Sequence, residues 1–296
     1  MFKKIYNSFC NENIVGKFIY ANVAIYIIVA FIGVFATLFN VVSPVSDFMQ
    51  WFELPSSLVR FACQPWSLLT YMFMHERVMH ILWNMVALYG FGKIFMSFFS
   101  MRHFVGVYIL GGIMGGLFFM LAFNLFPGFS GVVERSHLIG ASASVLAVVM
   151  AAAVRRPNFI VNLRFLGSMR LMTIAVITVV LSLLLLASEN AGGNFAHLGG
   201  AFAGWLFAYL LNKGVDITAF INKIIDFFAT FFRRTPKKEK PKFTFYKNGR
   251  TADYEYNATK KSNEEEIDRI LEKVKKGGYA SLSEEEKKKL FDASRS

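Results

Sequence analysis

Six apolar stretches, each long enough or nearly long enough to cross a membrane, constrain the fold of this chain more than any other feature. A helix needs about 20 predominantly apolar residues to cross the hydrocarbon core of a bilayer. Charged residues make up only 18% of the chain, compared with about a quarter in ordinary soluble domains. The sequence therefore predicts an all-α polytopic membrane protein with six transmembrane helices. The predicted spans are residues 17–41, 78–99, 104–126, 140–154, 170–187 and 195–212.

Basic residues collect in alternate loops, and this pattern predicts the orientation of the chain in the membrane. Short loops that are rich in Lys and Arg lie on the cytoplasmic side. The clusters precede span one, separate spans two and three, separate spans four and five, and follow span six, so both termini are predicted to be cytoplasmic. The pattern also accounts for the net charge of +12 without binding to nucleic acid. Its main members are Lys3, Lys4, Lys17, Lys93, Arg102, Arg155, Arg156, Arg164, Arg170, Lys213, Lys223, Arg233 and Arg234.

A change of composition after the sixth span divides the chain into a membrane part and a polar tail. Within the tail, Ser283 and Glu286 have capping-box spacing, which is typical of the start of a helix. The tail would either bind a cytoplasmic partner or remain a solvated extension, and the sequence leaves both interpretations open. The predicted segments are a cytoplasmic N-terminus at 1–16, a six-span domain at 17–213, an amphipathic to polar linker at 214–261 and a small soluble helical module at 262–296.

A serine and a histidine lie inside the apolar segments, where isolated polar side chains are costly and mark functional sites. Ser142 stands between small residues at the start of the fourth span, where free backbone N–H groups favour negative charge. His197 lies next to a glycine face in the sixth span. If Gly200 packs against the start of span four, His197 can act as a general base for Ser142. Plain helix packing is the alternative for each residue taken alone.

Three further polar residues lie in or just before the second span. His75 and His80 suggest a zinc protease at first, but their separation of five residues places them on different helical faces, unlike the i, i+4 pair of zincins. The sequence therefore predicts no metal site. His80 and Asn84 are four residues apart and share a face. They would either donate hydrogen bonds to an oxyanion or form a hydrogen-bonded pair that only fixes helix packing.

These motifs together resemble the rhomboid family of intramembrane serine proteases over about residues 15–215. The second-span pattern H-x-x-x-x-H-x-x-x-N is matched by His75, His80 and Asn84. The fourth-span pattern G-x-S-G is matched through Ser142, although its last glycine is an alanine here. The sixth-span pattern A-H-x-x-G-x-x-x-G is matched in full around His197. The polar tail resembles the extension of rhomboids from Bacteroidetes-type bacteria.

The resemblance implies a six-helix rhomboid-like bundle and a Ser-His dyad that uses no metal and no cofactor. Ser142 would be the nucleophile and His197 the general base. His80, Asn84 and the Ser142 backbone N–H would hold the oxyanion. His75 would be a supporting polar residue, and Gly140 belongs to the serine motif.

The implied substrates are single-span or other transmembrane proteins, cut near the external face of a bacterial inner membrane. Span five and a loop around residues 191–193 would control substrate entry. Two departures from the family pattern bear on the alignment of the dyad: Ala143 replaces a glycine, and Leu146 stands where many relatives have a tyrosine that stacks on the histidine. No acidic residue is placed within the spans to orient His197. The alternative function is a weak or inactive rhomboid-like factor that binds membrane proteins for quality control.

Overall fold

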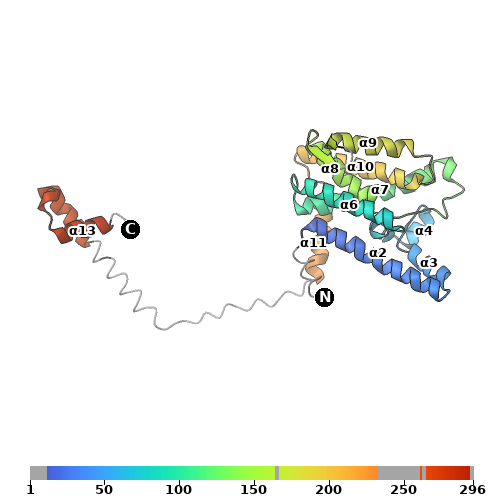
Figure 1. The fold of residues 1–296 in the computed structure, drawn as a ribbon, viewed down its shortest axis with the longest axis horizontal. Helices are drawn as coiled ribbons and strands as arrows, with labels where there is room; N and C mark the ends of the chain where they lie inside the picture. The colour runs from blue at the N-terminus through green and yellow to red at the C-terminus, as the bar shows by residue number, and fades with distance from the viewer. Residues whose placement is uncertain (1–11, 164–166, 233–260, 262–264, 294–296) are drawn as a thin grey trace. The chain divides into compact units, whose positions relative to one another are not determined.

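The computed structural model describes residues 12–163, 167–232, 261 and 265–293. Contacts between residues divide the chain into two units, one that ends at Arg234 and one that begins at Thr235. Figure 1 shows the first unit as a bundle of helices and the second as a small helical module.

Six helices of the first unit correspond to the six predicted spans, which confirms the all-α polytopic fold. Three of them, α2, α6 and α7, are long and apolar enough to cross a bilayer, whereas α8 and α9 have only 14 residues each. In Figure 1, α2 and α9 lie at opposite edges of the bundle. The six helices are α2 (Ile14–Leu38), α6 (Val78–Met96), α7 (Met101–Leu125), α8 (Ser142–Arg155), α9 (Leu171–Leu184) and α10 (Ala191–Asn212).

The core lies where α7, α8 and α10 meet, and small residues allow their backbones to approach closely. A Cβ atom at Gly200 of α10 would overlap the carbonyl oxygen of Ala143, and one at Gly204 would overlap that of Ala147. In lipid, where burial of apolar surface does not drive helix association, such close contact supplies the packing energy. The predicted packing of the sixth-span glycine face against the start of the fourth span is confirmed.

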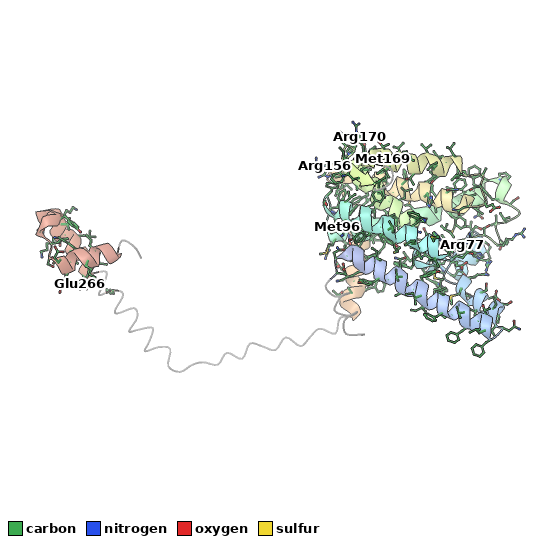
Figure 2. The ribbon with its side chains drawn as sticks, in the orientation of Figure 1. Arg77, Met96, Arg156, Met169, Arg170 and Glu266 are labelled. Carbon is green, nitrogen blue, oxygen red and sulfur yellow. The ribbon has the colours of Figure 1, made fainter. Side chains whose placement is uncertain are left out.

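The helices alternate in direction, so the basic residues gather at one end of the bundle. Figure 2 shows Arg156 and Arg170 at the end where α6 finishes with Met96, and Arg77 at the other end. A further helix, α11 (Ala219–Phe232), is tied to the start of α7 at the basic end, because Asp226 accepts a hydrogen bond of 3.0 Å from Arg102. The first unit therefore continues past residue 213, where the sequence predicts a linker.

The segment between the first two spans is structured along most of its length. Trp66 donates a hydrogen bond to the backbone oxygen of Trp51, and the two indole rings stack with centroids 5.9 Å apart. Its elements are α3 (Val42–Gln50), β1 (Leu54–Pro55), α4 (Leu58–Cys63), α5 (Ser67–Thr70) and η1 (Tyr71–Phe73). Strand β1 pairs antiparallel with β2 (His137–Leu138), which precedes α8. This pairing joins the segment to the chain just before Ser142.

The connection from α9 to α10 differs from the prediction. Residues 191–193 form the first turn of α10 rather than a loop, because the helix begins at Ala191. Asn194 stabilises this early start by donating a hydrogen bond of 2.7 Å to the carbonyl of Leu185 at the end of α9. At the other end of α9, β3 (Ile160–Leu163) and β4 (Gly167–Arg170) form a small antiparallel hairpin, which the sequence analysis did not predict.

In the described part of the second unit, a helix over residues 265–277 is joined to α13 (Glu284–Ala293) by η3 (Tyr279–Ser281). The predicted capping box is confirmed: Ser283 Oγ accepts from the Glu286 N–H, and the Glu286 carboxylate accepts from the Ser283 N–H at 2.8 Å. Buried Ile270 and Leu282 form the small core of this module. The predicted helix start at residues 262–264 lies outside the described residues.

Candidate active site

A cavity of about 460 Å³ lies between α6, α8, α9 and α10. Its lining includes four of the polar residues that the sequence singles out: His80, Asn84, Ser142 and His197. Most of the remaining lining is apolar. The fold thus brings side chains from three separate spans to one cavity.

Ser142 is the first residue of α8 and is half-buried. The first intrahelical hydrogen bond of α8 runs from the Val145 N–H to the Ala141 carbonyl at 2.9 Å. The Ser142 N–H therefore belongs to the first turn, where backbone donors have no acceptor within the helix. Ser142 thus carries both a free backbone N–H and a hydroxyl, and it lies at the positive end of the helix dipole.

Gly140 allows the histidine of α6 to lie directly beside this helix start. Its φ of +116° is a backbone conformation that side chains with a Cβ rarely adopt. A Cβ at Gly140 would lie 2.7 Å from both Cε1 and Nε2 of His80, well inside normal contact distance. The Gly140 N–H donates to the carbonyl of Tyr71 at 2.9 Å, which holds the glycine in place. Position 140 therefore requires glycine for two reasons: the positive φ, and the lack of space for a Cβ beside His80.

His80 and Asn84 share the face of α6 that borders the cavity. Asn84 is buried, and its Nδ2 donates a hydrogen bond of 2.9 Å to the backbone carbonyl of His80 one turn earlier. An amide nitrogen carries two hydrogens. This bond orients the side-chain amide and leaves its second N–H for a group in the cavity. One N–H of Asn84 thus stabilises the side chain against α6, and the other can donate a hydrogen bond to a group in the cavity.

His75 lies outside the cavity lining, behind His80. The two imidazole rings meet edge to face, with centroids 5.2 Å apart. Burial, with the neighbouring His80 adding to it, lowers the pKa of His75 to about 4, so this ring is neutral at neutral pH. Its Nδ1 lies 3.3 Å from the carbonyl of Phe73, which can only accept a hydrogen bond, so Nδ1 carries the proton. Within the described ranges, no three His, Cys, Asp or Glu side chains are grouped as metal ligands.

His197 is held by a residue that the sequence analysis missed. Its Nδ1 lies 3.2 Å from Oγ of Ser182, which is on α9 and buried. The orientation of the imidazole is therefore set by a hydrogen bond as well as by packing. Ser182 is a polar residue in an apolar span, so the criterion that singled out Ser142 could also have found it.

The two departures from the expected pattern are accommodated in different ways. Ala143 is buried, and its methyl faces α7, where a Cβ at Gly115 would lie only 2.5 Å from it. The additional methyl thus fills space between α7 and α8 that the glycine on α7 leaves free. Leu146 lines the cavity with His197 and presents an aliphatic wall in place of an aromatic ring.

Tyr71 connects the segment between α2 and α6 to both the site and the core. Its backbone oxygen accepts the Gly140 N–H, and its hydroxyl donates to the carbonyl of Gly112 on α7 at 2.6 Å. The side chain is fully buried. Together with the pairing of Leu54 and Leu138, these bonds fix the chain that leads into Ser142.

Comparison with models of known families identifies the family of this chain. A search of curated proteins finds no match. A model of a family of unknown function (DUF6576) matches residues 250–296, the region of the helical tail. A model of the rhomboid domain matches residues 62–214, which include every residue described at the cavity and more than half of the chain. The chain therefore belongs to the rhomboid family.

Proposed function

We propose that this protein is an intramembrane serine endopeptidase that cleaves transmembrane segments through a Ser142–His197 dyad. The observation that carries the proposal is the convergence of a helix-start serine, a histidine and two N–H donors on one cavity in an apolar bundle. Serine paired with a histidine base is a common arrangement for nucleophilic acyl transfer. Membership of the rhomboid family, most of whose characterised members are serine proteases, supports the same reaction.

In the proposed mechanism, His197 Nε2 takes the proton of Ser142 Oγ as the oxygen attacks the scissile carbonyl carbon. The carbonyl oxygen becomes an oxyanion, and the Ser142 N–H, His80 and Asn84 donate hydrogen bonds to it. The C–N bond then breaks, and His197 returns the proton to the leaving amine. Water, deprotonated by His197 in turn, hydrolyses the acyl-enzyme and frees Ser142. His75 and Gly140 support this machinery by positioning the His80 ring.

The proposed substrates are membrane proteins with at least one transmembrane segment. α9 borders the cavity and buries only three of its side chains, those of Leu171, Ala175 and Ser182. Among the helices that line the cavity, α9 would therefore give up the fewest buried side-chain contacts if it moved to admit a substrate. We place the basic end of the bundle, and with it both termini, in the cytoplasm of a bacterial cell, following the positive-inside rule.

The test compares the full chain with Ser142→Ala after reconstitution into vesicles with a single-span reporter. Ser144→Ala is the matched control, because it removes a hydroxyl from the same turn of α8 outside the cavity lining. We expect the reporter to be cut by the wild type and by Ser144→Ala, with or without a metal chelator, and to stay intact with Ser142→Ala. Equal cleavage by wild type and Ser142→Ala would refute the mechanism.

A second candidate is a rhomboid-like factor that binds membrane proteins for quality control with little or no proteolysis. The replacement of an aromatic wall by Leu146 beside His197 is the observation that favours it. Binding of the reporter without cleavage by the wild type would support this function instead.

A further inference from the structure

Ser182 is unusual among the residues of α9. Half of the side chains of this helix are exposed, and its buried apolar residues, Leu171 and Ala175, lie in its first half. Near its other end, Ser182 is only 3% exposed. A buried hydroxyl in an apolar helix requires hydrogen-bond partners, because leaving it unsatisfied costs free energy.

Ser182 has two such partners. Its Oγ lies 3.0 Å from the backbone carbonyl of Thr178, one turn earlier on α9, and 3.2 Å from Nδ1 of His197 on α10. None of the cavity-lining helices α6, α8, α9 and α10 contains Asp or Glu. No carboxylate from these helices can therefore hydrogen-bond to His197 Nδ1. In the described structure, the hydroxyl of Ser182 takes that place.

The hydroxyl of Ser182 has one hydrogen, and this decides where the proton of His197 lies. The Thr178 carbonyl can only accept, so the Ser182 hydrogen points to it. Oγ then offers a lone pair to His197, and Nδ1 must carry the hydrogen of the second bond. In the neutral ring this leaves Nε2 without a proton, free to accept one.

The opposite assignment is less favourable. If Ser182 donated to Nδ1, its oxygen and the Thr178 carbonyl oxygen would face each other at 3.0 Å with no hydrogen between them. The proton of His197 would then sit on Nε2. A ring in that form cannot accept the proton of Ser142 through Nε2.

We propose that Ser182 is a positioning residue that fixes the tautomer of His197, with the proton on Nδ1 and the lone pair on Nε2. This inference rests on the proposed function for its catalytic meaning, since an unprotonated Nε2 is the form that a general base requires. Because the bond joins α9 to α10, the same tautomer depends on α9 keeping its packed position.

The direct test is the nitrogen NMR spectrum of the full chain, labelled with 15N-histidine and held in lipid nanodiscs at a pH where His197 is neutral. His197→Gln identifies the relevant signals by their loss. We expect the wild type to show a protonated Nδ1 and an unprotonated Nε2, and Ser182→Ala to shift the population toward the other tautomer. Ser182→Thr, which keeps the hydroxyl, should restore the wild-type spectrum. Thr173→Ala is the matched control, since it removes an exposed hydroxyl from the same helix.

The kinetic test uses the single-span reporter. A hydrogen bond of ordinary net strength predicts that Ser182→Ala lowers kcat by about 2- to 10-fold, with KM unchanged and with rescue by Ser182→Thr. A protonated Nε2 in the wild type, or a tautomer that is the same in wild type and Ser182→Ala, would overturn the proposal whether or not the protein cleaves. If the spectra are as expected but the wild type does not cleave the reporter, the protease assignment would be refuted and the tautomer proposal would stand.

Discussion

Replacing Gly140 with alanine tests whether this glycine sets the position of His80. The added methyl group affects both the backbone conformation of residue 140 and its contact with the His80 ring. The residue has a φ of +116°, and its added Cβ would lie 2.7 Å from Cε1 and Nε2 of His80. Ordinary contact begins at 3.4 Å, so the imidazole would have to move away by roughly 0.7 Å. The His75 ring behind it, with centroids 5.2 Å apart, limits that movement.

The expected effects on stability and on activity differ in size. A residue with a Cβ in a sparsely populated backbone conformation costs ~1–3 kcal/mol of folding free energy. Displacing one donor of an oxyanion site lowers the rate by about 100- to 1,000-fold. Gly140→Ala should therefore remain folded, with a modest loss of stability and a large loss of activity.

The assay combines reporter cleavage with thermal unfolding in detergent. Gly167→Ala is the control for conformation alone, because its φ is +76° and a Cβ there would meet nothing within 4 Å. Gly131→Ala is the neutral control, with open space around it and no positive φ. The decisive comparison is the double variant with His80→Ala: if Gly140→Ala acts by displacing His80, it should reduce the rate little further once the ring is gone.

Two results would refute this reasoning. Full cleavage activity in Gly140→Ala would show that the methyl is tolerated beside His80. Rate losses that multiply in the double variant would show that Gly140 acts independently of His80.

Two further predictions concern packing and pH. Gly200→Ala should lower the free energy of unfolding by ~1–3 kcal/mol, because the methyl forces α10 away from the Ala143 carbonyl. Gly33→Ala on α2, with nothing within 4 Å of the added methyl, should not lower it in the same thermal scan, because alanine favours a helix more than glycine does. A hydrogen bond from the Ser283 N–H, together with one from Lys273, holds the pKa of Glu286 below its ordinary value. A carboxylate whose pKa is depressed in the folded state stabilises that state above its unfolded pKa, and this stabilisation is lost as pH falls through the folded value. Hydrogen exchange of the full chain should therefore show the start of α13 opening in acid, and Glu286→Gln should show that opening already at neutral pH; identical exchange in both proteins would contradict this.

The sequence predicts much of this site because its elements obey simple periodicity. The spacing of His80 and Asn84 places them on one face of a helix wherever that helix packs, and the glycines around His197 indicate close contact before any partner is known. The apolar spans also predict the order of the six helices. These inferences need only local geometry and the chemistry of the bilayer.

The features that sequence reasoning missed depend on tertiary contacts. Ser182 belongs to no motif, and its bond to His197 exists only because α9 packs against α10 in one particular register. The first turn of α10 contains two glycines, which suggest a loop, but Asn194 stabilises the helix by bonding to the end of α9. The positive φ of Gly140 likewise follows from its contacts with Tyr71 and His80 rather than from its neighbours in the chain.

Under the proposed function, the shortness of α8 would determine how deep in the membrane a substrate is cut. Its 14 residues span about 21 Å at ~1.5 Å per residue, whereas the hydrocarbon core is about 30 Å thick. If Arg155 marks one boundary of that core and α8 runs along the membrane normal, Ser142 would lie ~9 Å inside the other boundary, the length of about three residues of extended chain. The number of residues between the membrane surface and the scissile bond would thus be set by the length of one helix of the enzyme.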